Sequence, residues 1–107
     1  MPIKVLIKRR FKEGYVNEIN KVIKEIRFAA MHQEGYITSE TMWHHEDPFQ
    51  VVIVSNLRRI RYWNKWKNSY LRKSIDIKFQ EFLNGETEYE IFSLGVDPPL
   101  EKLNNRS

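Results

Sequence analysis

The chain has 107 residues, the length of a single domain, and carries a formal net charge of +4. It contains no cysteine, which excludes disulfides, thiolate nucleophiles and zinc–sulfur sites within it. Its N-terminus alternates apolar with basic side chains, unlike a secretory signal peptide, and no run approaches the roughly 20 apolar residues of a membrane span. We therefore expect a cytoplasmic protein that does not enter the membrane.

The first half of the chain predicts a strand, a helix and a strand pair. Residues 3–11 alternate with the period of two that is typical of a strand. Residues 15–33 carry an apolar stripe at helical spacing, and Gly35 follows where a helix would end. Residues 36–43 are rich in β-branched and aromatic side chains, and residues 49–55 contain the apolar run VVIV of a central strand, so this pair predicts a hairpin.

The second half predicts a broken helix and a last strand. Residues 57–68 carry a bulky apolar stripe at a spacing of three, and a second helical stripe runs from Leu71 to Phe82. Asn84-Gly85 ends that helix, and residues 86–94 predict the last strand. We expect one domain over residues 1–95, followed by a polar tail over residues 96–107 that is loose or lies on a partner.

The resulting order, β-α-β-β-α-β, is the α+β pattern of ferredoxin-like folds with an antiparallel sheet. Both helices would cover one sheet face, and the chain has no further element for the other face. We therefore expect a homodimer in which a second copy covers it. The side of the first strand that faces away from the helices carries basic residues. These could pair with Glu88 and Glu90 on the last strand, or all of these charges could simply be solvated.

Five fragments resemble the antibiotic biosynthesis monooxygenase family, in the family's order and over about residues 3–94: IKVLIKRRFKEG, QEGYITSET, DPFQVVIVSN, YWNKWKNSYLR and GETEYEIF. The more specific part combines Gly35-Tyr36 with Trp63, Trp66, Ser69 and Arg72. The resemblance implies a dimeric α+β barrel. It also implies an oxygenase without metal or organic cofactor, in which a phenolate or enolate substrate donates electrons to dioxygen.

Other members of that family cleave haem, and the resemblance allows a test of this branch. Haem cleavage requires a Trp on the second helix, an Asn on the first strand and a His on the following helix. Trp66 matches the first requirement, but Ile7 and Asp76 stand where the Asn and the His are required. We therefore do not expect haem degradation.

The candidate site would lie between the sheet and the helix pair. Trp66 could stack on a flat substrate, although Trp63 and Trp66 could also be core or dimer aromatics, which for Trp63 is the favoured interpretation. Arg9 could hold an anion at the pocket rim unless the strand has already ended there. Glu40, expected on the same face as Tyr36, could act as a base or be exposed. The substrate-binding candidates are Trp66, Tyr36, Ile7 and Arg72, and the catalytic candidates are Glu40 and Arg9.

Two further patterns suggest other sites. The turn His44-His45-Glu46-Asp47 contains metal-ligand types, but neighbouring imidazoles rarely reach one ion, so we expect no metal. The segment from Arg58 to Lys78 is strongly basic, which suits either an anion or nucleic-acid site or a solvated helix face. Because the third strand lacks the stacking aromatics of RNA-binding domains, we expect no nucleic-acid partner.

These expectations combine into two functional hypotheses. The first is a cofactor-independent monooxygenase that acts on a small aromatic or enolisable molecule. The alternative is a non-catalytic module of the same fold that binds a small ligand.

Overall fold

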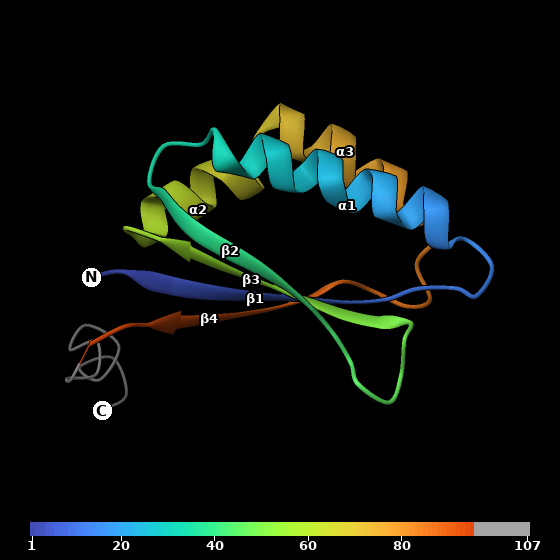
Figure 1. Ribbon diagram of the computed structural model, residues 1–107. Coiled ribbons are helices and arrows are strands. Elements are labelled where there is room, and N and C mark those ends of the chain that lie inside the picture. Colours follow the sequence, from blue (N-terminus) through green and yellow to red (C-terminus); the bar gives the residue numbers. More distant parts are fainter. Residues whose placement is uncertain (96–107) are drawn as a thin grey trace, which may run out of the picture.

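A computed structural model describes residues 1–95 of the protein (Figure 1). The predicted tail over residues 96–107 lies outside the described residues. Along the chain the structure contains β1 (Ile3–Arg10), α1 (Val16–Met31), β2 (Tyr36–Trp43), β3 (Gln50–Leu57), α2 (Ile60–Lys67), α3 (Tyr70–Gln80) and β4 (Glu88–Ser93).

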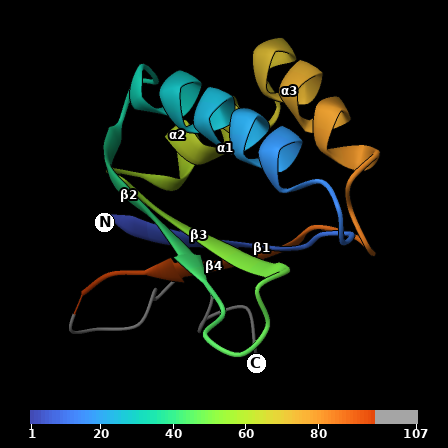
Figure 2. The same cartoon turned by 45° about the vertical axis from the view of Figure 1, so that its right-hand side comes forward.

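The four strands form one antiparallel sheet in the order β2-β3-β1-β4. All three helices lie on the same side of this sheet, with α1 beside α3 (Figures 1 and 2). No helix of residues 1–95 covers the opposite side, which we call the open face. This arrangement confirms the predicted ferredoxin-like α+β fold with its second helix broken in two.

The core lies between the sheet and the helices, and it follows from the alternation of β1. Ile3, Val5 and Ile7 are buried on the helix-facing side of β1, while the residues between them lie on the open face. Four residues of α1 at helical spacing pack against them from above: Ile19, Val22, Ile23 and Ile26. Trp63, Ile75 and Phe79 close the core from α2 and α3.

The central hairpin strand is longer than its sequence predicts. The sequence predicts a strand that ends at residue 55 and a helix that begins at residue 57, but Asn56 and Leu57 continue β3 and pair with Lys4 and Ile3 of β1. Leu57 is buried in the core on the helix-facing side. The apolar spacing that suggested a helix from residue 57 is therefore shared between the end of a strand and α2, which begins at Ile60.

A β-bulge at the start of β2 changes which residues face the helices. Tyr36 pairs with Leu57, whereas Thr38 pairs with Asn56, so Ile37 is the extra residue. From this point Ser39 and Thr41 share a face with Tyr36, and Glu40 pairs with Val54 on the open face. The expectation that Tyr36 and Glu40 share a face was wrong, because it assumed an unbroken period of two.

The open face carries the expected charge pairing between β1 and β4. The Lys8 ammonium of β1 forms an ion pair with the Glu90 carboxylate of β4. The alternative, that these charges are all simply solvated, does not hold for this pair.

Among the described residues, no helix is both long enough and apolar enough to span a bilayer.

Gly35 connects α1 to β2 and offers a test of the fold. Its φ of +81° is in the left-handed region, and a Cβ atom at this position would overlap the ring of Tyr62 in α2. Gly14 has a similar φ of +97°, but a Cβ atom there would meet no neighbour within 4 Å.

We expect Gly35→Ala to lower the free energy of unfolding by roughly 2–5 kcal/mol, the sum of backbone strain and overpacking. Gly14→Ala is the matched control and should lower it by roughly 1–2 kcal/mol, because only the backbone strain applies. Urea denaturation followed by circular dichroism measures both. Equal losses in the two variants would contradict the close packing of Tyr62 on Gly35.

Candidate functional site

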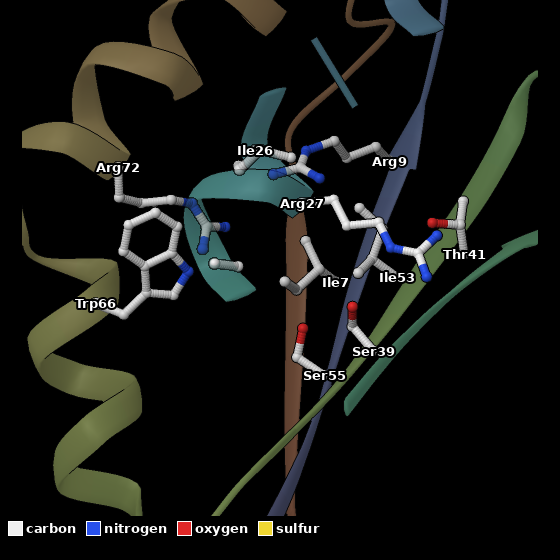
Figure 3. Close-up of a pocket in the computed structure, with 11 residues that line it drawn as sticks. Ile7, Arg9, Ile26, Arg27, Ser39, Thr41, Ile53, Ser55, Trp66 and Arg72 are labelled. Carbon is white, nitrogen blue, oxygen red and sulfur yellow. The ribbon is translucent and has the colours of Figure 1, made fainter. Parts of the chain in front are cut away.

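A pocket lies between the sheet and the helices, in the region where the sequence placed the candidate site (Figure 3). It is lined by residues from β1, α1, β2, β3, α2 and α3. These residues are Ile7, Arg9, Ile26, Arg27, Ala30, Ser39, Thr41, Ile53, Ser55, Trp66 and Arg72.

Arg9 enters this pocket because β1 continues its alternation through Arg10. As an odd-numbered residue of the strand, Arg9 points toward the helices and is only 2% exposed. Its guanidinium group lies over the ring of Phe79, 4.3 Å from the centroid. The alternative interpretation, that β1 has ended and Arg9 is solvated, was wrong.

Arg72 reaches the same pocket from α3. Ser69 caps the start of this helix, because its side-chain oxygen accepts a hydrogen bond from the Arg72 backbone N–H at 3.1 Å. The Arg72 side chain then points inward, where it is 1% exposed and lies against the rings of Trp63 and Trp66. In Figure 3 the indole of Trp66 stands beside the Arg72 guanidinium.

Asp76 of α3 is the shared partner of both arginines. Arg72 Nε donates to both carboxylate oxygens at 3.2 Å, and Arg9 Nη2 donates to Oδ1 at 3.4 Å. These distances are longer than the roughly 2.7–2.9 Å of a strong charge-assisted hydrogen bond. One carboxylate is therefore divided between two cations and holds neither of them tightly.

Three buried guanidinium nitrogens have no hydrogen-bond partner within the described residues: Arg9 Nε, Arg9 Nη1 and Arg72 Nη2. Buried polar groups in proteins nearly always have partners, and an unsatisfied one costs about 1–3 kcal/mol or more when charged. The pocket thus presents donors without acceptors, which is the arrangement expected of a site for an anion.

Burial and the nearby charge of Arg72 both affect the pKa of Arg9. Burial, assisted by the positive charge of Arg72, lowers the pKa of Arg9 from its ordinary value to about 10. Arg9 remains charged at neutral pH. A lowering of this size corresponds to about 3 kcal/mol that the fold spends to keep the charge buried, and an anion in the pocket would offset that cost.

The rest of the pocket is apolar with hydroxyl groups on the sheet side. Ile7, Ile26 and Ile53 supply aliphatic walls, and Figure 3 shows the hydroxyl groups of Ser39 and Ser55 directed toward the cavity. The cavity volume is only about 20 Å³, room for about one water molecule. Arg27, an exposed residue of α1, also lines the pocket.

The structure brings four of the six candidate residues together. Ile7, Arg9, Trp66 and Arg72 all line the pocket. Tyr36 does not line the pocket, but it lies on the helix-facing side of β2. Its hydroxyl group forms a 2.9 Å hydrogen bond with the hydroxyl group of Ser39, which does line the pocket. Glu40 does not line the pocket, because the bulge places it on the open face. Trp63 lies in the core, as the sequence favoured.

Sequence reasoning missed the hydroxyl-bearing residues of the pocket. Ser39 and Thr41 could not be assigned to it without knowledge of the bulge at residue 37. Ser55 could have been found from the period of two, which puts it on the same face of β3 as Ile53; the structure shows that it is buried. Asp76 was not predicted as a pocket contact, although its spacing of four from Arg72 in a helix indicates contact between the two side chains.

The two other patterns in the sequence have structural explanations. His44 Nδ1 accepts hydrogen bonds from the backbone N–H groups of Glu46 and Asp47, so it orders the turn between β2 and β3. Within residues 1–95, no three His, Asp or Glu side chains gather closely enough to hold a metal ion.

Much of the basic segment from residue 58 to residue 78 is engaged within the protein. Lys65 pairs with Glu34, Lys78 pairs with Glu25, and Lys67 lies over the ring of Tyr89. Arg61 contacts Tyr62 in the same helix, and Arg72 is buried in the pocket. These contacts account for a large part of the basic charge without an external partner.

Comparison with known proteins places the fold. No protein-family model and no curated protein matches the sequence. Among solved structures, a conserved protein from Methanosarcina mazei Go1 is 23% identical, with a TM-score of 0.80 over 86% of this chain and 91% of its own. A candidate antibiotic biosynthesis monooxygenase from Nitrosomonas europaea has a TM-score of 0.81 at 9% identity, covering 91% and 92%.

A third similar structure is SnoaB, a cofactor-independent oxygenase from Streptomyces nogalater, with a TM-score of 0.78 at 9% identity, over 92% of this chain and 97% of its own. These identities are low, so the similarity concerns the path of the backbone. The protein has the fold of the antibiotic biosynthesis monooxygenases.

Proposed function

We propose that the pocket binds a small aromatic or enolisable molecule as its anion, and that the protein oxidises this molecule with dioxygen without a cofactor. The observation that carries the proposal is the pair of buried arginines beside Trp66, with three guanidinium nitrogens that lack partners. The similarity in fold to a cofactor-independent oxygenase supports the reaction type.

The arginines explain how an anion could form in this pocket. Two positive charges at one pocket favour the ionised form of a phenol or enol and lower its pKa. The effect is larger in a poorly solvated pocket than in water. Trp66 supplies a flat apolar surface for a ring, and the hydroxyl groups of Ser39 and Ser55 supply hydrogen bonds. Because the cavity holds only about one water molecule, ligand binding requires the side chains that line it to move apart.

The electrons for the reaction come from the substrate. The bound anion transfers electrons to dioxygen, an activated CH₂ carbon becomes C=O, and the second oxygen atom leaves as water with the two hydrogens of that carbon. This stoichiometry needs no external reductant. The protein's part is to hold the anion, to keep water out and to leave room for dioxygen beside the ring.

One observation favours the second candidate function, binding without catalysis. Among the described residues that line the pocket, there is no carboxylate, imidazole or amine to take the proton. Arginine does not serve as a base at neutral pH. Under this candidate the protein would carry a stable aromatic anion without oxidising it.

Oxygen uptake decides between the two functions. The purified protein is tested with hydroxylated polycyclic aromatics, hydroquinones and haem, without added metal or flavin. We expect uptake with an enolisable polycyclic aromatic, and a loss of roughly tenfold or more in Arg9→Gln, because a hydrogen bond to a charged group is removed. Arg10→Gln, the neighbouring exposed arginine that pairs with Asp47, is the matched control and should keep the wild-type rate.

Binding is followed in the same experiment through tryptophan fluorescence. An aromatic anion should quench the emission of the wild type and of Trp63→Phe, but much less that of Trp66→Phe, since only Trp66 lines the pocket. Quenching without uptake by any compound would support the binding function. Equal quenching in all three proteins would contradict the location of the site.

We also propose that the protein is a homodimer through the open face. No helix of residues 1–95 covers this face, and its strands carry apolar side chains among the charged ones: Leu6, Met42, Val52, Val54 and Phe92. Burial of such a face against a second copy would stabilise a domain of this size.

Sedimentation equilibrium at micromolar concentration tests this proposal. The wild type should sediment as a dimer, and Val52→Lys should shift it toward the monomer by at least about tenfold in the dissociation constant, because it places a charge in the apolar interface. Leu71→Lys, on the exposed side of α3, is the control and should leave the dimer intact. A monomeric wild type would refute the dimer.

A further inference from the structure

Asp76 stands at the boundary between the pocket and solvent. Its side chain is 32% exposed, whereas the two arginines that it contacts are almost fully buried. Asp76 also lines an open groove of about 320 Å³, together with Arg9, Phe79, Tyr89 and neighbouring residues of the segment before β4. The Asp76 carboxylate therefore reaches solvent on one side while it contacts the two guanidinium groups on the other.

The charges at this point do not balance. Within the described residues, Asp76 is the only carboxylate in an ion pair with Arg9 or Arg72. Two buried cations and one shared anion leave one positive charge in the pocket. Arg27 also lines the pocket, but it is exposed and its charge is screened by water.

We propose that Asp76 sets the charge that the pocket accepts, so that the site takes a planar aromatic monoanion and rejects dianions. This inference rests on the proposed function and names its substrate class. A monoanion neutralises the remaining charge and supplies acceptors for the unpartnered nitrogens. A dianion would bring its second negative charge close to the carboxylate of Asp76. The two like charges repel each other, and Asp76 cannot move away because α3 holds it in place.

Asp76 is thus a positioning residue that acts through the arginines and does not itself line the inner pocket. The long hydrogen bonds to it fit this role. A carboxylate bound tightly to the arginines would occupy their hydrogen-bond donors and remove their affinity for a ligand. The Asp76 carboxylate, shared between the two arginines, holds both side chains in position and leaves some of their N–H donors free.

The test measures the dissociation constants of benzoate and phthalate, a monoanion and a dianion at pH 8, by calorimetry. The wild type should bind benzoate at least about tenfold more tightly than phthalate. Asp76→Asn should lose or invert this preference through a gain of about tenfold or more for phthalate, because a nearby like charge is removed. Asp76→Glu should keep the wild-type preference, and Asp47→Asn, at the exposed pair with Arg10, is the matched control.

Thermal denaturation distinguishes a change in ligand preference from a failure of the variant to fold. Asp76→Asn should melt at a lower temperature than the wild type without ligand, and phthalate should raise its melting temperature more than that of the wild type. Phthalate binding to the wild type as tightly as benzoate would overturn the inference, whatever the variant does. So would an unchanged preference in a folded Asp76→Asn protein.

The outcomes also separate this inference from the proposed function. Binding of benzoate with no charge preference refutes only the role of Asp76. The predicted preference without any oxygen uptake refutes only the oxygenase activity. If the folded wild type binds neither anion, the anion-binding pocket is refuted, and the role of Asp76 with it.

Discussion

The alternation of side chains along β1 is the constraint on which both the core and the site depend. A strand covered by helices on one side must send every second residue into the core. In β1 that rule buries Ile3, Val5 and Ile7, and because the strand stays paired through Arg10, it also buries Arg9. A guanidinium group enters the interior here through strand geometry. The remaining features of the pocket surround that charge.

The neighbouring elements each contribute a different kind of contact around the buried Arg9 charge. Phe79 offers an aromatic face to Arg9, and Asp76 offers part of a carboxylate. Arg72 adds a second cation instead of cancelling the first, and Trp63 and Trp66 shield it from water. A core selected for stability alone would be expected to replace such a group with apolar residues. Two buried arginines with three unpartnered nitrogens are what the proposed anion-binding function would require.

Most of the fold could be predicted from the sequence, because period two and helical spacing are local signals that survive into the structure. The type and order of the elements followed from these patterns, while the ends did not: Leu57 looks like the first residue of an apolar helical stripe but belongs to β3. The inward direction of Arg9 was also predictable from Ile7. The bulge at Ile37 was not, since no glycine or proline marks it, and this single residue moved Glu40 out of the candidate site and Ser39 into it.

Asp76 shows a different limit of sequence reasoning. Its partner Arg72 is one helical turn away and easy to find, but Arg9 is distant in the chain, so the shared contact needs the tertiary structure. The family resemblance indicates only that residue 76 is not the histidine that would bind haem iron. The structure shows instead what it contacts, which is both cations of the pocket.

The burial of Arg9 also has a consequence for the protein in the cell. A fold that holds a buried cation at a cost is less stable without its ligand than with it, and ligand binding shifts the folding equilibrium by mass action. Small changes in the folded fraction alter how quickly cellular proteases remove a protein. Under the proposed function, the abundance of this protein would rise and fall with the supply of its ligand, with no change in the transcription of its gene.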